Sequence, residues 1–339
     1  MHKFFYSFEA NSHWEMGLKM GQEFADEVER GFSRLNSENV TISKHKMNQS
    51  LWFTKKYFPQ YIEELEGYAK GANVKFEKLW YLSMDLDLFS EKCTTLITNH
   101  CKKFMHLEEG NLTSQAEICL VKTTLDKKVK FELYYYNTLG ANACGLTSDG
   151  LIFSINNMYH NDKSFGIPKN VLARALVDCE TLKKMTNILS KIPRMSGYNF
   201  NFIFTNLQNF QDLVGSNIET SAREYEIIDI ETPYIHTNHY LGRLKYLDDL
   251  AVVQRKTATT SHNRYGFAKE RIREEMSTQK LKELSSELLG NTGCDLHSYN
   301  SDGRMIFDLE NKQIHVHLER EKATGWVVYN ICDILNLNE

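Results

Sequence analysis

The spacing of apolar residues along the chain changes near residue 92. Before that point apolar residues recur every three to four positions, which is typical of amphipathic helices. Ser12 followed by Glu15 forms the capping pair of a helix start. Gly17 and Gly21 fall on one face of that helix, and we interpret them as a close helix-packing contact. The pattern predicts helices over residues 12–34 and 59–71 and from residue 76 onward.

After residue 92 short apolar runs with a period of two predict strands. Ser148-Asp149-Gly150 marks a hairpin turn between two of them. The predicted strands cover residues 94–98, 116–123, 129–137, 139–147, 151–157, 200–205, 224–230, 305–309, 314–318 and 326–329. Helices are predicted over 168–176, over 182–189 and within the charged stretch 264–288. This order predicts an α+β chain in which two sheets are covered by helices.

The composition of the chain excludes several classes of function. The chain has 339 residues, 42% of them hydrophobic and 25% charged, which allows a sizeable core. A net charge of −4 and a pI near 6.3 predict no basic surface for nucleic acid or for an anionic membrane. We find no signal peptide and no apolar run long enough for a membrane span. The seven cysteines form no C-x-x-C pair, so we expect a reducing, cytoplasmic compartment rather than a disulfide framework.

Cys93 lies where the helical pattern stops and the strand pattern begins. Two threonines and an alternating apolar run follow it, so it begins a predicted strand. A thiol at the end of an ordered element is well placed for nucleophilic attack. The alternative is that Cys93 is a small buried residue without a chemical role. The pattern alone leaves both interpretations open.

The stretch His236-Thr237-Asn238-His239 is a second candidate for chemistry. Two histidines three residues apart can bind a metal when they lie on a helix, but the β-like flanking residues argue against a helix here. His315 and His317 share one face of a predicted strand, which we expect to be exposed. We therefore predict no metal site. The Asn238 amide can donate a hydrogen bond to a developing oxyanion without titrating.

Six pieces of the chain, in order, resemble one enzyme family. They are Gly17-x-x-x-Gly21, residues 61–72, Cys93-Thr94-Thr95, the hairpin from Gly145 to Asn156, His236-Thr237-Asn238-His239 and Ser261-His262-Asn263-Arg264. Together they resemble the acyl-coenzyme A:6-aminopenicillanate acyltransferase family, peptidase family C45, within the N-terminal-nucleophile (Ntn) hydrolase superfamily.

The resemblance implies a four-layer αββα Ntn-hydrolase fold and a precursor that cuts itself. Cleavage between Lys92 and Cys93 would give a helical pro-segment of residues 1–92 and a catalytic segment of residues 93–339. The freed α-amine of Cys93 would then serve as the base for its own thiol, because its unperturbed pKa lies near 7.7–8.0. We expect the two fragments to remain associated, and a homodimer is one option for the assembly.

The resemblance also implies roles for individual residues. Cys93 would be the nucleophile and Asn238 the oxyanion donor, while Asn156 would line the pocket. Arg264 would support the surroundings of the nucleophile or bind substrate. A buried amide for Asn156 and a salt bridge at a helix start for Arg264 are the structural alternatives. The expected substrate-binding residues are Thr94, Thr95, Asn111 and His239.

The implied activity is hydrolysis or acyl transfer on a small acyl-amide, other than a peptide, or on an acyl-CoA thioester, without a cofactor. One departure from the family pattern motivates an alternative. An Asp that the family carries downstream of the nucleophile is missing, and Glu109, Asn111 and Thr113 are the candidates to replace it. Lys92 also replaces the usual Gly before the nucleophile, and Ser301-Asp302-Gly303-Arg304 replaces a Ser-Arg-Gly. The alternative is a catalytically degenerate homologue that acts as a binding or scaffold protein.

Overall fold

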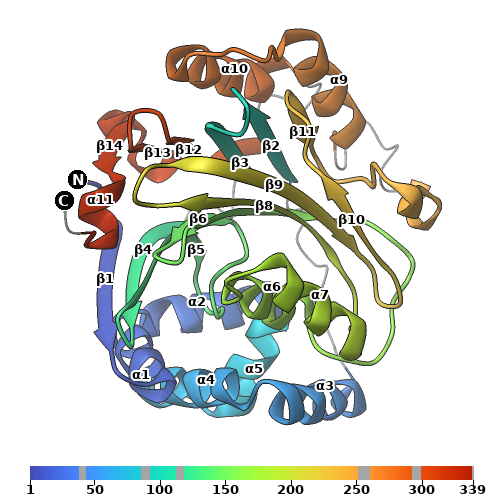
Figure 1. The fold of residues 1–339 in the computed structure, drawn as a ribbon. Helices are drawn as coiled ribbons and strands as arrows, with labels where there is room; N and C mark the ends of the chain where they lie inside the picture. The colour runs from blue at the N-terminus through green and yellow to red at the C-terminus, as the bar shows by residue number, and fades with distance from the viewer. Residues whose placement is uncertain (38–42, 85–91, 112–117, 251–259, 292–298, 338–339) are drawn as a thin grey trace.

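The computed structural model describes residues 1–37, 43–84, 92–111, 118–250, 260–291 and 299–337. These residues form four stacked layers, with helices outside and two sheets inside (Figure 1). The α+β class and the αββα layering predicted for the chain are confirmed.

The first outer layer covers one face of the larger sheet (Figure 1). It contains α1 (His13–Glu23), α2 (Ala25–Ser37), α3 (Lys44–Tyr57), α4 (Pro59–Gly71), α5 (Phe76–Ser83), α6 (Lys169–Val177) and α7 (Leu182–Lys191). The helix predicted over residues 12–34 is in fact two helices, because α1 ends at Phe24.

The larger sheet has eight strands, and only its β1–β4 pair is parallel. In spatial order the strands are β1 (Phe5–Ala10), β4 (Ile118–Leu125), β5 (Lys128–Tyr135), β6 (Cys144–Thr147), β7 (Leu151–Asn157), β8 (Tyr198–Asn206), β9 (Gln211–Thr220) and β10 (Tyr225–Asp229). The sequence pattern missed β1 and β9. The segment 1–92, expected to be a helical pro-segment, therefore also contributes β1 as an edge strand of this sheet.

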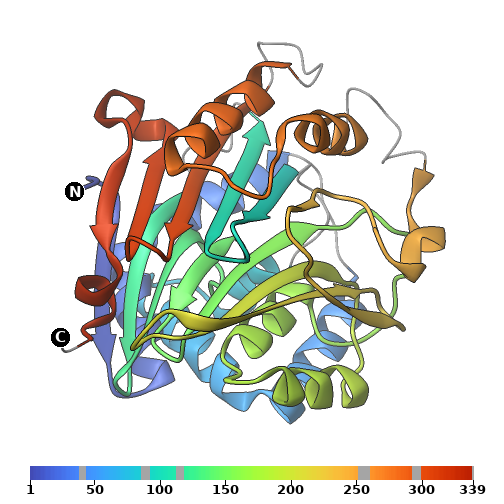
Figure 2. The same cartoon turned by 45° about the horizontal axis from the view of Figure 1, so that its top comes forward.

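The smaller sheet has six strands and lies between the larger sheet and the second helical layer (Figure 2). Its order is β11 (Tyr234–His236), β2 (Lys92–Thr98), β3 (Lys103–Asn111), β12 (Tyr299–Asp308), β13 (Gln313–Leu318) and β14 (Val327–Asn330). Helices α9 (Ser261–Arg271) and α10 (Thr278–Asn291) cover its outer face. The remaining short helices are η1 (Arg243–Leu247), η2 (Glu319–Thr324) and α11 (Ile331–Leu335). The pattern did not predict β3 or β11.

Glycines let α1 and α4 approach closely. A Cβ atom on Gly17 would lie 1.8 Å from the Glu64 carbonyl oxygen, and one on Gly71 would lie 2.2 Å from the Leu18 carbonyl oxygen. No side chain fits at those distances, so the two backbones are in direct contact. The helix-packing interpretation of the glycine pair is confirmed.

Each pair of adjacent layers encloses its own apolar core, and alternation along the strands divides the residues between them. On β2, Leu96 faces the core under α9 and α10, whereas Ile97 faces the core between the sheets. Phe153 of β7 belongs to the core under the first helical layer, and its neighbour Ile152 faces the space between the sheets. Cys93, two and four residues from Thr95 and Ile97, therefore shares the inter-sheet face of β2.

Candidate active site

Cys93 is the second residue of β2 and is 2% exposed. Its three polar groups contact three different parts of the chain. The backbone N–H donates to Asn238 Oδ1 at 3.1 Å, the carbonyl accepts from Arg264 Nη1 at 2.6 Å, and the thiol donates to Glu108 Oε2 at 3.4 Å. These contacts fix the backbone on both sides of the thiol.

The short strand β11 explains how Asn238 reaches Cys93. Backbone pairing between β11 and β2 stops at the pair His236–Thr95. Beyond it the chain leaves the strand, and the Asn238 side chain takes the place of a backbone acceptor for the Cys93 N–H. The Asn238 amide nitrogen donates to the Asn157 carbonyl at 2.9 Å. The oxygen of Asn238 thus faces the backbone nitrogen of Cys93, and its Nδ2 has a second hydrogen available for an oxyanion.

Arg264 enters the site from α9 in the outer layer. It is fully buried, and besides the Cys93 carbonyl it contacts Thr94 Oγ1 at 2.7 Å and Asn238 Oδ1 at 2.5 Å. Its Nε donates to Thr260 Oγ1 at 2.9 Å, at the start of the helix. A planar guanidinium can hold several oxygen acceptors in fixed directions at once. Arg264 therefore fixes Cys93, Thr94 and Asn238 relative to one another.

The residues that the sequence analysis missed are on β3. Glu108 pairs directly opposite Cys93, and His106 pairs opposite Thr95. Both are buried; Glu108 accepts from Tyr135 Oη at 2.9 Å, and its Oε1 lies 2.7 Å from His106 Nε2. The signal was present in Phe104-Met105-His106-Leu107-Glu108, where apolar Met105 and Leu107 alternate with the polar pair. That alternation predicts a strand with His106 and Glu108 on one face.

A second polar group lies across the inter-sheet space from Cys93. Thr95 Oγ1 donates to Asn156 Oδ1 at 3.0 Å and lies 2.8 Å from Ser154 Oγ on β7. Asn201 Nδ2 on β8 donates to the same Asn156 oxygen at 2.8 Å. The amide nitrogen of Asn156 is buried and has no hydrogen-bond partner in the described chain. Asn156 is thus both the buried amide of the structural alternative and a side chain next to the predicted site residue Thr95.

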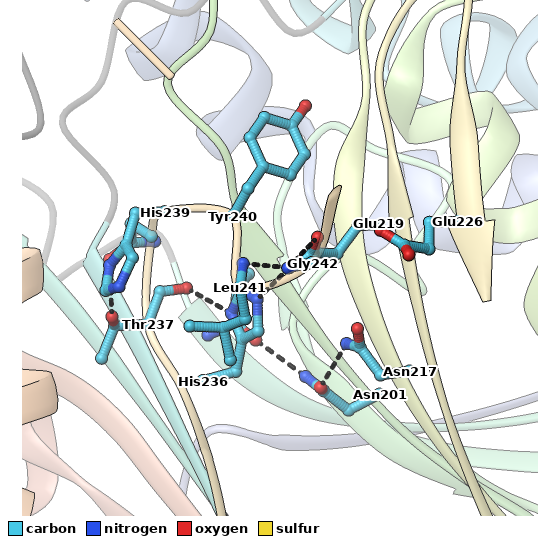
Figure 3. A network of polar contacts seen from close by, with 12 residues as sticks. Asn201, Asn217, Glu219, Glu226, His236, Thr237, His239, Tyr240, Leu241 and Gly242 are labelled. Atoms are coloured by element: carbon cyan, nitrogen blue, oxygen red, sulfur yellow. Dashed lines mark hydrogen bonds and ion pairs between the residues drawn. The ribbon is translucent and has the colours of Figure 1, made fainter. Parts of the chain in front are cut away.

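Beyond these asparagines a buried carboxylate orders the chain after β11 (Figure 3). Glu219 Oε1 lies 3.1 Å from His236 Nε2 and accepts from the Leu241 N–H at 2.6 Å, while its other oxygen accepts from the Gly242 N–H at 3.0 Å. Both Glu219 and His236 are fully buried. The carboxylate therefore fixes both ends of the segment that carries Asn238.

His239 lies beside this segment and stacks on His262 with ring centroids 4.1 Å apart. Its Nδ1 lies 2.7 Å from Ser261 Oγ. Burial, with the nearby His236 and His262 adding to it, lowers the pKa of His239 to about 3. His239 is therefore neutral at pH 7. Its predicted contact with substrate stays a prediction.

The other two predicted substrate-binding residues are Thr94 and Asn111. Thr94 alternates with Cys93 and Thr95, so it faces α9 and contacts Arg264 rather than the inter-sheet space. Asn111 is the last residue of β3, three positions beyond Glu108, and pairs with Tyr299. Thr113 lies outside the described residues. Glu109 lies opposite Lys92 in the backbone pairing of β3 with β2.

The prediction of no metal site stays a prediction, and it did not consider one set of potential ligand atoms. Among the described residues, the ligand atoms of Cys93, His106 and Glu108 all lie within 4.8 Å of one another. The missed strand β3 supplies two of the three, which is why the set escaped the sequence analysis. His315 and His317, expected on an exposed face, are both 7% exposed, and burial lowers the pKa of each to about 4.

A cavity of about 340 Å³ opens at the opposite end of β7 from Asn156. Two ion pairs lie in its lining, Lys128 with Asp149 and Arg174 with Asp178. It contains none of the site residues named above. We therefore assign the chemistry to the buried groups around Cys93 and not to this cavity.

The chain is similar in sequence to one protein family and to one curated relative. The family model of acyl-coenzyme A:6-aminopenicillanic acid acyl-transferase matches residues 113–320, which include Asn156, Asn238 and Arg264 and begin after Cys93. The β-alanyl-dopamine/carcinine hydrolase of Drosophila melanogaster is 23% identical over 92% of this chain and 92% of its own length.

Two solved structures are similar at 10% identity. A mutant of the conjugated bile acid hydrolase from Clostridium perfringens aligns over 73% of this chain and 95% of its own, with a TM-score of 0.44. Penicillin V acylase from Agrobacterium tumefaciens aligns over 67% and 83%, with a TM-score of 0.37. Within the described residues, no helix is both long and apolar enough to cross a membrane.

The family model covers more than half of the chain and includes the segments that hold Asn238 and Arg264 beside Cys93. This chain therefore belongs to the acyl-coenzyme A:6-aminopenicillanic acid acyl-transferase family, and it is an enzyme that hydrolyses or transfers acyl groups.

Proposed function

We propose that this chain is a self-processing cysteine amidohydrolase that cleaves small acyl-amides through an acyl-Cys93 intermediate. The observation that carries the proposal is the set of three contacts around Cys93, which hold its nitrogen, its carbonyl and its thiol separately. A merely structural cysteine has no need of a carboxylate on its thiol and a guanidinium on its carbonyl.

The first step of the proposal is cleavage of the Lys92–Cys93 bond. Before cleavage the α-amine of Cys93 is tied up in a peptide bond, so another group must take the thiol proton. Glu108 Oε2, 3.4 Å from the sulfur, is that group. The thiolate attacks the Lys92 carbonyl, the C–N bond to Cys93 breaks, and the leaving nitrogen receives the proton from Glu108. This N-to-S acyl shift frees the Cys93 α-amine, and water then hydrolyses the resulting thioester to release the Lys92 carboxylate and the Cys93 thiol.

The second step is turnover of substrate. The freed α-amine accepts the thiol proton, since its pKa lies near neutrality, and Asn238 Oδ1 holds this nitrogen in place. The thiolate attacks the substrate carbonyl, and the second hydrogen of Asn238 Nδ2 donates to the oxyanion. The amine leaves with a proton from the α-amine. Water releases the acyl group by the same route.

The two fragments of residues 1–92 and 93–339 would stay together after cleavage. β1 pairs with β4 along its full length, and α1 and α4 pack into the core that covers the larger sheet. Separation would expose that apolar surface to water, which opposes dissociation. The helices of the precursor segment would therefore remain as a permanent layer of the mature enzyme.

The substrate class follows from the relative. Its name describes a hydrolase of β-alanyl-dopamine and carcinine, and it matches nearly the whole chain. We propose linear amides between a small acyl group and a primary amine as substrates, with acyl-CoA thioesters as alternative acyl donors. The net charge of −4 suits small cationic amines better than polyanions.

Intact-mass spectrometry tests the proposal. The wild-type chain should resolve into the two fragments and should release amine from β-alanyl amides. Cys93→Ala should remain a single folded chain without activity, whereas the control Cys101→Ala, another buried cysteine, should process normally. Glu108→Gln should process far more slowly. A wild-type chain that stays intact and inactive after long incubation would indicate a binding or scaffold protein instead.

A further inference from the structure

The carboxylate and the imidazole that surround the Cys93 thiol have a second use. From their geometry we infer that Cys93, His106 and Glu108 form a binding site for a thiophilic divalent cation of the Zn²⁺ class, and that this cation arrests the nucleophile. Binding itself is independent of the proposed function, whereas the arrest rests on it.

The three ligands come from facing positions on two adjacent strands. Cys93 pairs opposite Glu108, and His106 is two residues away on the same face of β3. The three ligand atoms lie within 4.8 Å of one another, and the side chains are at most 2% exposed. Zn²⁺ binds S, N and O ligands at about 2.0–2.3 Å, so ligand atoms of a tetrahedral site lie about 3.4 Å apart. The sulfur-to-Glu108 distance of 3.4 Å already matches this spacing.

The hydrogen bond between His106 and Glu108 must open for the cation to enter. His106 Nε2 and Glu108 Oε1 are 2.7 Å apart, the distance of a hydrogen bond. A cation between them would replace that hydrogen bond with two metal–ligand bonds and would increase the distance between the two atoms by roughly 0.7 Å. The thiol proton leaves as the metal–sulfur bond forms. A rotation of the flexible Glu108 side chain can supply this movement without a shift of either strand.

The surrounding contacts already orient the ligands. His106 Nδ1 lies 2.9 Å from Thr95 Oγ1, which directs Nε2 toward Cys93 and Glu108. Tyr135 Oη donates to Glu108 Oε2 at 2.9 Å. Histidine and carboxylate ligands of metal sites are held by such outer hydrogen bonds.

The ligand types select the cation. A thiolate with an imidazole and a carboxylate suits Zn²⁺ and its relatives Cd²⁺ and Co²⁺, while Mg²⁺ and Ca²⁺ prefer oxygen ligands only. Bonding to the cation withdraws electron density from the thiolate and fixes its sulfur, which makes it a poor nucleophile toward the Lys92 carbonyl and toward a substrate. The cation would thus stop self-processing and turnover together.

The first test is a titration of the chelator-treated full chain with Cd²⁺, monitored by the ultraviolet absorption of the thiolate-to-metal bond. The second test is a hydrolysis assay in the presence of Zn²⁺. We expect one Cd²⁺ per chain, loss of the absorption in Cys93→Ala, and at least tenfold weaker binding in His106→Gln and Glu108→Gln. Tyr135→Phe keeps all three ligands and should weaken binding by a smaller factor. His315→Gln, a buried histidine elsewhere, should leave binding unchanged.

The outcomes separate this inference from the proposed function. Cadmium absorption that is unaffected by His106→Gln, or absent up to millimolar Cd²⁺, overturns the metal site even if the chain hydrolyses amides normally. Cadmium bound as expected by a chain without hydrolytic activity keeps the metal site and overturns the proposed function. Chelator-reversible inhibition by Zn²⁺ in the wild type, reduced in parallel with binding in His106→Gln, supports both.

Discussion

The space between the two sheets has two halves of opposite character, although the same strands build both. On β2, β3, β7 and β8 the inter-sheet positions are apolar at one end, with Ile97, Phe104, Ile152 and Ile203. Two residues further along each strand they become polar, with Thr95, His106, Ser154 and Asn201. We call these the apolar half and the polar half.

The two halves are buried to the same extent, yet they satisfy different requirements. The apolar half excludes water and stabilises the sandwich by burial of hydrocarbon. Groups in the polar half need hydrogen-bond partners instead, and Thr95 and Asn201 bond to each other and to Asn156 Oδ1, whereas the Asn156 amide nitrogen has no partner among the described residues. The same strands thus carry the apolar scaffold at one position and the candidate site two residues away. Substitutions in each half should therefore have separable effects.

The largest expected effect on stability is in the apolar half. Phe307 is fully buried and packs edge-on against Phe104, with ring centroids 5.9 Å apart. Phe307→Ala should lower the free energy of unfolding by about 3–5 kcal/mol, because it leaves a cavity. Urea unfolding measures the loss. Hydrolysis per folded molecule should stay near the wild-type value, and a large fall would show that the two halves are not separable.

Arg264→Lys should have the largest effect on the polar half. A lysine cannot span the Cys93 carbonyl, Thr94 and Asn238 together. We expect a loss of about 1.5–3 kcal/mol in transition-state stabilisation, or about 10- to 100-fold in rate. Arg194→Lys is the matched control, since this buried arginine donates hydrogen bonds to backbone carbonyls away from the site. It should reduce stability and spare the rate per folded molecule.

Asn201→Ala tests the polar half at its centre. The substitution leaves the side chains of Asn217 and Tyr234 without their acceptor on Asn201. We expect a loss of about 1–3 kcal/mol in unfolding free energy, together with slower turnover because Asn156 loses a partner. Thermal unfolding and kcat measured on one preparation would separate the two effects. A variant with normal kcat would assign Asn201 to the scaffold alone.

The last prediction concerns pH. The pKa of His239 is about 3 in the folded chain and 6.5 when unperturbed, so the unfolded chain binds the extra proton first as the pH falls. This contribution to stability is complete above pH 6.5 and is lost as the pH falls toward 3. His239→Asn should therefore show a shallower decline of unfolding free energy over that range. An unchanged slope would mean that His239 is not buried in solution.

The sequence by itself determined the layer order and two of the key residues. Periods of two and of 3.6 separated strands from helices, and alternation within each strand assigned its apolar residues to a face. Cys93 and Asn238 were predicted from motifs, and the structure brings them into contact. β11 escaped prediction because three residues are too few to show an alternating pattern.

Only the tertiary structure decided which polar groups meet at the thiol. Glu108 contacts Cys93 because antiparallel pairing places residues 93 and 108 opposite one another, and a slip of one residue would turn Glu108 to the other face. Asn201 approaches Thr95 across the gap between the two sheets, at a sequence separation of 106 residues. Periodicity along one strand fixes the face on which a side chain lies. The partner that it meets depends on strand register and sheet packing, which arise from contacts distant in sequence.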